Sequence, residues 1–354
     1  MQVLEKLKMP LTTLGESVID QHAINFWAQK LNPLWSFNQA LGKIVHIETA
    51  ARDMLSFKIR VNRLFKFGEA GQHHPVFVVI KGIRYERSYS LTRVDQQHVL
   101  LTVKQVNAGK VSSWLAEQAK VGDIIEFGQP FGDMTLPEQA HPMILLAAGS
   151  GITPMLSILE ALDQKTEFSV PVTLWYWVKH NQEAAFITRF EALARKYPNF
   201  SYQVFATQEQ QAAPRLDASY LTQLQNLEQS VVYACGPSGF VSTAEPLFSS
   251  VKLFKSEAFS MSLGDMSDTG FVNVTLTRSK KTVSIPKGHS ILVSLEHQNI
   301  KPAHGCRMGI CNKCVCNKVE GATKNLVNGA QSTEPGNALK ICVNSAQTDL
   351  VIDL

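Results

Sequence analysis

Three patterns of apolar and polar positions divide the chain. Residues 41–138 hold short segments in which the two kinds alternate, and this predicts half-buried β-strands. Residues 139–257 open on an apolar run, a glycine turn and a helical stretch, HPMILLAAGSGITPMLSILEAL, and continue with further apolar strands and helices. That order predicts a doubly wound parallel sheet. After a linker at 258–270, residues 271–354 predict a β-hairpin in FVNVTLTRSKKTVSIPKG, a short helix in SILVSLEHQNI and a closing strand pair.

Residues 1–40 belong to none of these three units. The segment ESVIDQHAINFWAQKLNPLWSF has helical spacing, and Pro33 ends the helix. Its apolar residues share one helical face: Ile19, Ala23, Phe26, Trp27 and Leu31. We expect this face to pack on the following domain. The alternative is a docking or membrane-surface element, because the aromatic residues and Lys30 suit an interface.

Composition is ordinary for a folded protein, with 354 residues of which 45% are hydrophobic and 18% charged. This length predicts two or three domains. The net charge of +4 does not indicate a nucleic-acid partner. The charge is uneven, since residues 271–354 carry ten Lys and Arg against five Asp and Glu. A basic segment suits an acidic docking face or an anionic membrane surface, and salt would weaken binding there.

The chain has no apolar run long enough to span a membrane, and its N-terminus has an early Glu5 and no continuous apolar region. We therefore expect neither a membrane helix nor a signal peptide. The expected location is the cytoplasm, with peripheral contact at the inner face of the membrane as an option. In a reducing compartment, clustered cysteines hold metal more often than they form disulfides.

Five of the six cysteines follow residue 300. Cys306, Cys311 and Cys314 have the spacing C-x4-C-x2-C, and 27 residues separate Cys314 from Cys342. This is the plant-type spacing of a [2Fe-2S] cluster. A structural zinc ion is the alternative, but zinc usually takes two close pairs of ligands. Cys316 is left as a spectator thiol, or as a substitute for Cys314.

The residues around the cysteines agree with an iron–sulfur site. Gly305 and Gly309 let the loop fold so closely that backbone N–H groups can point at the cluster sulfurs. With the flanking hairpin, helix and strand pair, residues 271–354 resemble a β-grasp ferredoxin domain of the plant type. Asn312 departs from that family, which usually has a small residue there. The departure bears on the tuning of the cluster and not on its presence.

The segment RSYS at residues 87–90 lies between GQHHPVFVVIKGIRYE and LTVKQVNAGKVSSWL. It resembles the R-x-Y-S motif of the ferredoxin–NADP reductase superfamily, which places the motif on a strand of an antiparallel flavin-binding barrel. The resemblance implies that Arg87 pairs with a flavin phosphate and that Tyr89 lies against the isoalloxazine or ribityl chain. It also implies that Ser90 is a catalytic residue near flavin N5. Ser88 completes the motif.

A second segment supports the flavin hypothesis, because RSYS alone is compatible with an ordinary strand. GKVSSWL begins a helix whose N-terminal N–H groups favour a pyrophosphate. FAD is therefore the expected cofactor, and residues 41–138 are the expected barrel. The further FAD-binding positions expected here are Val103, Lys104, Gly109, Lys110, Val111, Ser112 and Ser113.

The Gly-Ser-Gly turn after the first parallel strand predicts a nucleotide site. Gly149 and Gly151 permit the close approach of a pyrophosphate. Thr153 can bond to it, and Pro154 fits the first helical turn. A bare glycine turn would be a weak signal, but this one opens the alternation of strands and helices.

The same superfamily resemblance assigns further positions. It places the Cys-Gly-Pro of SVVYACGPSGFV beside the nicotinamide and the Glu-x-Phe of KSEAF toward the flavin. The positions are Cys235, Gly236, Pro237, Glu257 and Phe259. Together with the last serine of RSYS, Cys235, Glu257 and Phe259 are the expected catalytic residues. Without the Gly-Pro that follows it, Cys235 would be interpreted as a small buried hydrophobe.

The choice of nicotinamide nucleotide depends on the end of the second parallel strand. Lys179 and His180 stand where an acidic residue would mark a free ribose 2′-hydroxyl. Their cationic groups suit a 2′-phosphate, and Arg215 can contribute. We therefore expect NADPH rather than NADH. The alternative is that Lys179 is a solvated strand end.

The order of an N-terminal helix, flavin, nicotinamide and ferredoxin modules resembles the reductase partners of bacterial membrane acyl desaturases. The resemblance implies that hydride passes from NAD(P)H to FAD and that single electrons pass to the [2Fe-2S] cluster and on to a di-iron membrane desaturase. Two alternatives remain open. One is the reductase of an aromatic-ring (Rieske-type) or alkane oxygenase, and the other is a flavin and iron–sulfur redox sensor.

Overall fold

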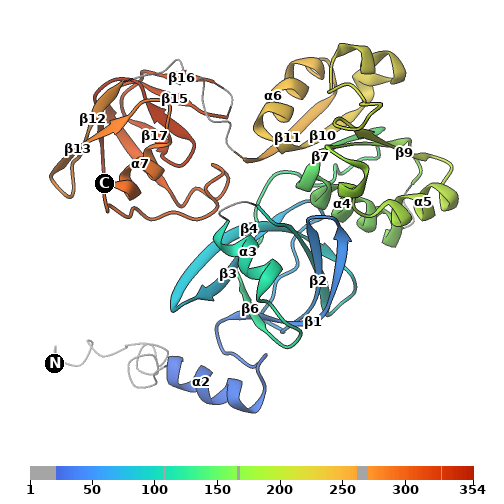
Figure 1. Cartoon of the computed structure of the whole chain (residues 1–354), viewed down its shortest axis with the longest axis horizontal. Helices are drawn as coiled ribbons and strands as arrows, with labels where there is room; N and C mark the ends of the chain where they lie inside the picture. The colour runs from blue at the N-terminus through green and yellow to red at the C-terminus, as the bar shows by residue number, and fades with distance from the viewer. Residues whose placement is uncertain (1–20, 107–108, 166–167, 261–269, 328) are drawn as a thin grey trace, which may run out of the picture.

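The computed structural model describes residues 21–106, 109–165, 168–260, 270–327 and 329–354. In these ranges the chain forms a barrel, a parallel sheet flanked by helices and a ferredoxin-like unit (Figure 1). The helix α2 (Gln21–Leu31) lies at the end of the barrel opposite the other two units. None of the helices in the described ranges is long and apolar enough to cross a membrane.

The expected barrel is confirmed. Six antiparallel strands close in the order β1-β2-β5-β4-β3-β6. Alternating residues point inward, so that Phe57, Ile59 and Leu101 are fully buried in its core. The elements are β1 (Ala40–Ala51), β2 (Met54–Val61), β3 (His73–Ile80), β4 (Ile83–Arg93), β5 (His98–Lys104), α3 (Lys110–Glu117) and β6 (Ile124–Phe127).

The expected packing of the N-terminal apolar face on the barrel is wrong for the residues that the structure describes. The helix α2 forms, but Phe26, Trp27 and Leu31 are all more than half exposed. Its polar side faces the protein instead, because the side chain of Asn25 is buried and accepts a hydrogen bond from the backbone N–H of Phe37. Ile19 and the side chain of Ala23 lie outside the described part of the chain.

The doubly wound parallel sheet is also confirmed, with strand order β11-β10-β7-β8-β9. Both faces are buried: α4 and α5 pack on one core cluster and α6 on the other. The last strand runs through Ser260, past the boundary expected at residue 257. The strands are β7 (Met143–Ala148), β8 (Val172–Val178), β9 (Phe200–Ala206), β10 (Val231–Pro237) and β11 (Leu253–Ser260). The helices are α4 (Ile152–Lys165), α5 (Ile187–Lys196) and α6 (Ser238–Leu247), with 3₁₀ turns η1 (Gly149–Gly151), η2 (Asn181–Glu183), η3 (Ala218–Gln223) and η4 (Leu227–Gln229).

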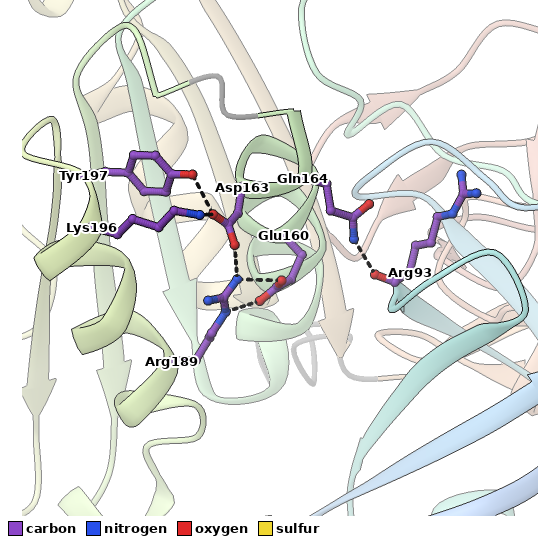
Figure 2. Close-up of polar contacts among 7 residues, drawn as sticks. All are labelled: Arg93, Glu160, Asp163, Gln164, Arg189, Lys196 and Tyr197. Atoms are coloured by element: carbon purple, nitrogen blue, oxygen red, sulfur yellow. Dashed lines mark hydrogen bonds and ion pairs between the residues drawn. The ribbon is translucent and has the colours of Figure 1, made fainter.

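A charged network joins α4 to α5 (Figure 2). The carboxylate of Asp163 accepts hydrogen bonds from Arg189, Lys196 and Tyr197, each at 2.6 Å. Burial alone would raise the pKa of Asp163, but these bonds outweigh it and hold the pKa well below its usual range. On the other side of α4, Gln164 donates to a backbone carbonyl of β4. The helix is thus fixed to both its neighbours.

The C-terminal unit has its own hydrophobic core. The predicted hairpin is confirmed by antiparallel pairing of β12 with β13, and the predicted helix by α7. The main sheet has the order β13-β12-β19-β14-β17, and a small sheet has the order β16-β15-β18. The elements are β12 (Phe271–Leu276), β13 (Lys281–Pro286), α7 (Ile291–His297), β14 (Val315–Glu320), β15 (Thr323–Asn325), β16 (Gln331–Ser332), β17 (Asn337–Lys340), β18 (Asn344–Ala346) and β19 (Leu350–Ile352).

Candidate redox site where three domains meet

A cavity of about 290 Å³ opens where the barrel, the parallel-sheet domain and the ferredoxin-like domain meet. Every one of these domains contributes motif residues to its wall. The lining residues are Arg87, Ser88, Tyr89, Ser90, Thr102, Lys104, Val106, Gly109, Lys110, Val111, Ser112, Ser150, Thr153, Ala258, Phe259, Cys306, Arg307, Met308 and Val327. Motifs more than 200 positions apart in the sequence therefore share one space.

The four residues of RSYS lie on β4 and all line the cavity. Arg87 Nη1 donates to the backbone carbonyl of Glu86 at 2.7 Å, and Arg87 forms no ion pair with any residue in the described ranges. Burial, and then the charge of Arg307, lower the pKa of Arg87. The hydroxyl of Ser88 is buried and has no partner among the described residues. Two groups thus await a hydrogen-bonding or anionic partner here.

The start of α3 approaches the same cavity. A Cβ at Gly109 would lie 2.3 Å from Ser112 Oγ, so only glycine lets the chain turn so tightly there. Lys110, Val111 and Ser112 line the cavity, whereas the side chain of Ser113 does not. The start of α3 therefore lies at the wall of the cavity, and its part in binding a pyrophosphate stays a prediction.

The side chain of Val103 does not line the cavity, and its expected part in FAD binding stays a prediction. Val103 is buried in the barrel core instead. Successive side chains of a strand point to opposite sides, so its neighbours Thr102 and Lys104 face the cavity. Lys104 Nζ also lies 2.7 Å from Glu183 Oε2 and so links the barrel to the parallel-sheet domain.

A buried histidine, absent from the sequence expectations, connects two of the expected catalytic residues. His73 on β3 stands opposite Ser90 on β4, and its Nε2 is 3.1 Å from Ser90 Oγ. The same nitrogen is 3.0 Å from Glu257 Oε2, at ion-pair distance but without hydrogen-bond alignment. Phe259 meets the His73 ring edge-on at 5.7 Å and lines the cavity. The two histidines of GQHHP are a signal that could have been used.

The glycine turn of the parallel sheet is built for close approach. Gly149 has a φ of +55°, and a Cβ at Gly151 would lie 1.9 Å from the carbonyl oxygen of Cys235. Thr153 Oγ1 donates to the carbonyl of Ser150 at 3.1 Å. Pro154 is the third residue of α4, in its first turn. The turn therefore leaves room for a ligand where larger side chains would block it.

The Cys-Gly-Pro segment ends β10 directly beneath this turn. Cys235 is fully buried, pairs in register with Glu257 on β11 and does not line the cavity. Burial, and then the charge of Glu257, raise the pKa of the Cys235 thiol. Gly236 is required by close packing, since a Cβ there would lie 2.8 Å from Ala148 Cβ. Pro237 is exposed at the strand end.

An acidic residue, also missed from the sequence, stands at the expected 2′-phosphate position. Lys179 is exposed after β8, and His180 Nδ1 lies 3.8 Å from Glu209 Oε1. The other interaction of that carboxylate oxygen is with the backbone N–H of Asn181, at 2.9 Å. Arg215 is exposed. The local charge is therefore mixed rather than simply cationic.

The four expected cluster ligands stand as two pairs. Backbone N–H groups of Cys306 and Cys311 each donate to the other's sulfur, at 3.2 and 3.3 Å. The sulfurs of Cys314 and Cys342 lie 3.0 Å apart. No set of three or more ligand side chains converges on one point within the described ranges. Two pairs nevertheless suit a [2Fe-2S] cluster, in which each iron takes two protein ligands.

Electrostatics link the two pairs. The hydrogen bond with Cys306 lowers the pKa of Cys311 to about 5, and the bond with Cys342 lowers that of Cys314 to about 7. The charge of Cys311 acts on Cys314, so the pairs are near one another. Cys316 belongs to neither pair; it is buried, with its sulfur 3.8 Å from the carbonyl of Leu339.

The cluster loop is attached to the barrel beside RSYS. Lys313 Nζ lies 2.9 Å from both carboxylate oxygens of Glu86. A Cβ at Gly305 would lie 2.8 Å from Glu86 Oε1 and 2.9 Å from Cys311 Sγ. Glycine is therefore needed where the loop passes between the barrel and its own cysteines.

Comparisons with known proteins agree with these three sites. Residues 42–136 match the description "Oxidoreductase FAD-binding domain", residues 145–245 match "Oxidoreductase NAD-binding domain", and residues 274–343 match "2Fe-2S iron-sulfur cluster binding domain". The cavity fits FAD, because it offers the Ser88 hydroxyl without a partner, the Arg87 guanidinium without an ion pair, and the start of α3.

Relatives match this chain over most of its length. An NADPH oxidoreductase of Mycobacterium tuberculosis is 32% identical over 91% of this chain and 86% of its own length. A phthalate 4,5-dioxygenase oxygenase reductase subunit of Pseudomonas putida is 28% identical over 80% of this chain and 87% of its own length. The solved structure of a phthalate dioxygenase reductase has the same fold, with a TM-score of 0.64 at 24% identity over 89% of this chain and 98% of that one.

These matches define the class, an NAD(P)H oxidoreductase that uses FAD and a [2Fe-2S] cluster. The chain belongs to the family in which FAD-binding and NAD-binding domains of the ferredoxin–NADP reductase type are fused to a C-terminal [2Fe-2S] ferredoxin domain.

Proposed function

We propose that this chain is the reductase component of an oxygenase system, taking electrons from NAD(P)H and delivering them to the metal centre of a separate oxygenase. The observation that carries the proposal is the shared cavity, in which Cys306, Arg307 and Met308 of the cluster loop face RSYS. FAD supplies the conversion between a two-electron donor and a one-electron acceptor. A redox sensor would not need the cluster to open toward the flavin-binding wall.

The proposed acceptor is an aromatic-ring oxygenase. A relative that spans most of the chain is the reductase subunit of phthalate 4,5-dioxygenase, and this supports an oxygenase of that kind over the desaturase expected from module order. A di-iron membrane desaturase stays the second candidate. The observation in its favour is the exposed apolar side of α2, which would suit contact at a membrane.

The residue roles are part of the proposal. Arg87 and the start of α3 bind the FAD phosphates. Ser90 Oγ, facing the cavity, exchanges a proton with His73 Nε2, and Glu257 Oε2, 3.0 Å from the same nitrogen, stabilises this arrangement. Phe259 forms the wall beside them, and Cys235 shapes the nucleotide turn from below.

We propose NADPH as the donor. Lys179 and His180 support it, and the relative from Mycobacterium tuberculosis is an NADPH oxidoreductase. Glu209 opposes it, because a carboxylate repels a 2′-phosphate. Substitution of Glu209 by glutamine should therefore raise kcat/KM for NADPH and leave that for NADH little changed. An equal change in kcat/KM for NADPH and for NADH would show that Glu209 does not act at the ribose 2′ position.

The test of the main proposal is an anaerobic titration of the purified holoprotein with NADPH and separately with NADH, followed by visible absorbance and EPR. Bleaching of the flavin with a rhombic signal from a reduced [2Fe-2S] centre is expected. Turnover is then measured with a purified dioxygenase component and with a purified desaturase component, and the component that is reduced faster is identified as the acceptor. Flavin bleaching without the EPR signal would overturn the proposed electron path, and failure to turn over with any acceptor would favour a sensor.

A further inference from the structure

The helix α2 is attached to the protein by its polar side. Asn25 Oδ1 accepts hydrogen bonds from Ser36 Oγ and from the N–H of Phe37, and Asn25 Nδ2 donates to Asn38 Oδ1 at 2.7 Å. One turn further, Gln29 Nε2 donates to Gln39 Oε1. A helix on a water-facing protein surface normally turns its apolar side inward. Here the arrangement is reversed.

The outward side carries large apolar side chains. Phe26, Trp27 and Leu31 are 56%, 69% and 80% exposed. Trp35 and Phe37, in the segment that follows the helix, are also more than half exposed. We call these five residues the apolar face. A concentration of large exposed apolar residues marks a contact with another molecule or with a membrane.

The apolar face is held in place and is not a frayed end. Asn62 Nδ2 donates to the carbonyls of Leu34 and Gln39, at 3.2 and 2.9 Å, and so ties the segment to the barrel. The N–H of Leu34 donates to the side chain of Asn32 at 3.0 Å. Between this segment and the barrel lies a hollow of about 1090 Å³, larger than the cavity at the redox site and on a different part of the barrel.

The charged residues of α2 and of the lining of the hollow have one sign. Lys30 is exposed, with Nζ 5.3 Å from the centre of the Phe26 ring. Lys43, Arg60 and Arg63 line the hollow. No Asp or Glu occurs in residues 21–47 or among the residues that line the hollow. Such a surface complements an anionic one.

We propose that the apolar face binds the surface of an anionic phospholipid bilayer, with Phe26, Trp27 and Leu31 in the interface and the four cations at the headgroups. Tryptophan and phenylalanine are favoured at the boundary between headgroups and acyl chains. A basic rim adds attraction to an anionic leaflet. A protein partner would need an apolar groove with several acidic residues beside it to match these four cations. An anionic bilayer offers an apolar interior and negative headgroups at every point of its surface. Lipid binding of this kind does not depend on which oxygenase accepts the electrons.

The test uses the holoprotein and two kinds of vesicle, one of phosphatidylcholine alone and one of phosphatidylcholine with phosphatidylglycerol. Sedimentation with the anionic vesicles is expected at low salt and should weaken as salt is raised. The double variant W27Q/L31Q should bind them at least about tenfold more weakly, because two apolar anchors are lost. The charge variant K30Q should lose about fivefold on anionic vesicles only.

The matched control is F271Q, which removes an equally exposed aromatic residue (73% exposed) from the ferredoxin domain. It should bind like the unchanged protein. Fluorescence quenching by brominated lipids gives a second readout, since Trp27 should be quenched in the vesicle-bound protein. All variants should keep full turnover with an artificial acceptor, because none lies near the redox cavity. Loss of that turnover would count against the redox function, whereas loss of vesicle binding would not.

Three outcomes would overturn the proposal. One is equal sedimentation of W27Q/L31Q and the unchanged protein. Another is dimerisation that W27Q/L31Q abolishes, which would make a second copy of the chain the occupant of the apolar face. The third is the absence of vesicle binding together with salt-resistant binding to the purified acceptor, which would make a protein the occupant.

Discussion

The barrel has two junctions, and they are built differently. Toward the nucleotide-binding domain, the two units share one hydrophobic core, in which Met54 and Met134 from the barrel side join Ile158 and Leu159 of α4. Toward the ferredoxin domain no such sharing is found among the described residues, because that domain has a core of its own.

Polar contacts repeat the contrast. At the first junction, the buried hydroxyl of Ser157 donates to the carbonyl of Leu91 and accepts from the N–H of Gly71, so it fixes α4 on the barrel. At the second junction, Lys313 pairs with Glu86 while 46% exposed. Two cationic side chains, Arg87 and Arg307, also act on each other across it.

The difference agrees with the chemistry on each side. Hydride transfer requires the reacting atoms within a few tenths of an ångström of a fixed geometry, so a rigid junction is favoured. Transfer of single electrons tolerates a longer and less fixed approach. A ferredoxin domain attached to the barrel through the ion pair of Lys313 with Glu86 can also release part of its surface to an external acceptor. The predictions below act on one junction or the other.

The largest effect is expected from loss of a cluster ligand. Substitution of Cys342 by serine should abolish the [2Fe-2S] EPR signal and all electron delivery through the ferredoxin domain, because a buried cluster cannot be held by three thiolates and a poor fourth ligand. Reduction of ferricyanide directly from the flavin should persist, since the first junction is untouched.

The control is substitution of Cys316 by serine. Its sulfur bonds weakly to the carbonyl of Leu339 and belongs to neither cysteine pair. The cluster absorbance and EPR signal should survive in this variant. A lost signal in C316S together with a retained one in C314S would show that Cys316, and not Cys314, is the ligand.

The sequence could predict the positions of residues that belong to a short local motif. RSYS, the Gly-Ser-Gly turn and the cysteine loop each fold from adjacent residues, and all of them reach the cavity or its immediate walls. His73 and Glu209 were missed because their roles come from strand pairing and from neighbouring strand ends, which spacing alone does not reveal.

The side chain of Val103 lies in the barrel core, because successive side chains of a strand point to opposite faces. Another expectation failed for an equally specific cause. The apolar side of α2 was predicted to face the protein, but it faces outward. Apolar periodicity shows that a helix has an apolar and a polar side, and it does not show which of them packs on the protein. The polar bonds of Asn25 decide that, and they involve residues more than ten positions away.

The second prediction concerns pH and tests whether the barrel and nucleotide domain unfold as one unit. Burial lowers the pKa of His74 to about 4, with a smaller effect from His73, against a hydrogen bond to Lys66 that raises it. The unfolded chain therefore binds more protons than the folded one between pH 6.5 and 4. The stability due to neutral His74 is complete above that window and falls by about 3 kcal/mol toward its lower end.

Calorimetry of the unchanged protein and of H74Q across this range measures the effect. The difference should appear in a joint transition of the barrel and nucleotide domain and leave the ferredoxin transition unmoved. A pH effect confined to part of that joint transition would show that the shared core does not couple the two units.

The third prediction compares the same substitution at the first junction and at the contact of the ferredoxin domain with α6 of the nucleotide-binding domain. Ser157→Ala should lower the free energy of unfolding by about 2 kcal/mol, because it leaves a buried carbonyl and a buried N–H without their shared partner. Ser242→Ala removes one exposed bond to the carbonyl of Val327 and should cost less than about 0.5 kcal/mol. Chemical denaturation of both variants measures the two losses in the free energy of unfolding. Equal losses would contradict the proposed difference between the buried junction and the contacts of the ferredoxin domain.

A small effect on stability is also expected at Lys313, and this variant gives the most direct view of the second junction. Lys313→Ala breaks an exposed ion pair and should cost below about 1 kcal/mol. The same pair holds the cluster loop beside RSYS, so cluster reduction after mixing with NADPH should slow by up to about fivefold. In the unchanged protein, rising salt should slow this rate as it screens the pair, and in K313A the rate should already be low and insensitive to salt. Lys281→Ala, which removes the same charge from exposed β13, is the control and should keep the salt dependence. If K313A and the unchanged protein show the same response to salt in stopped-flow measurements, Lys313 and Glu86 do not position the ferredoxin domain.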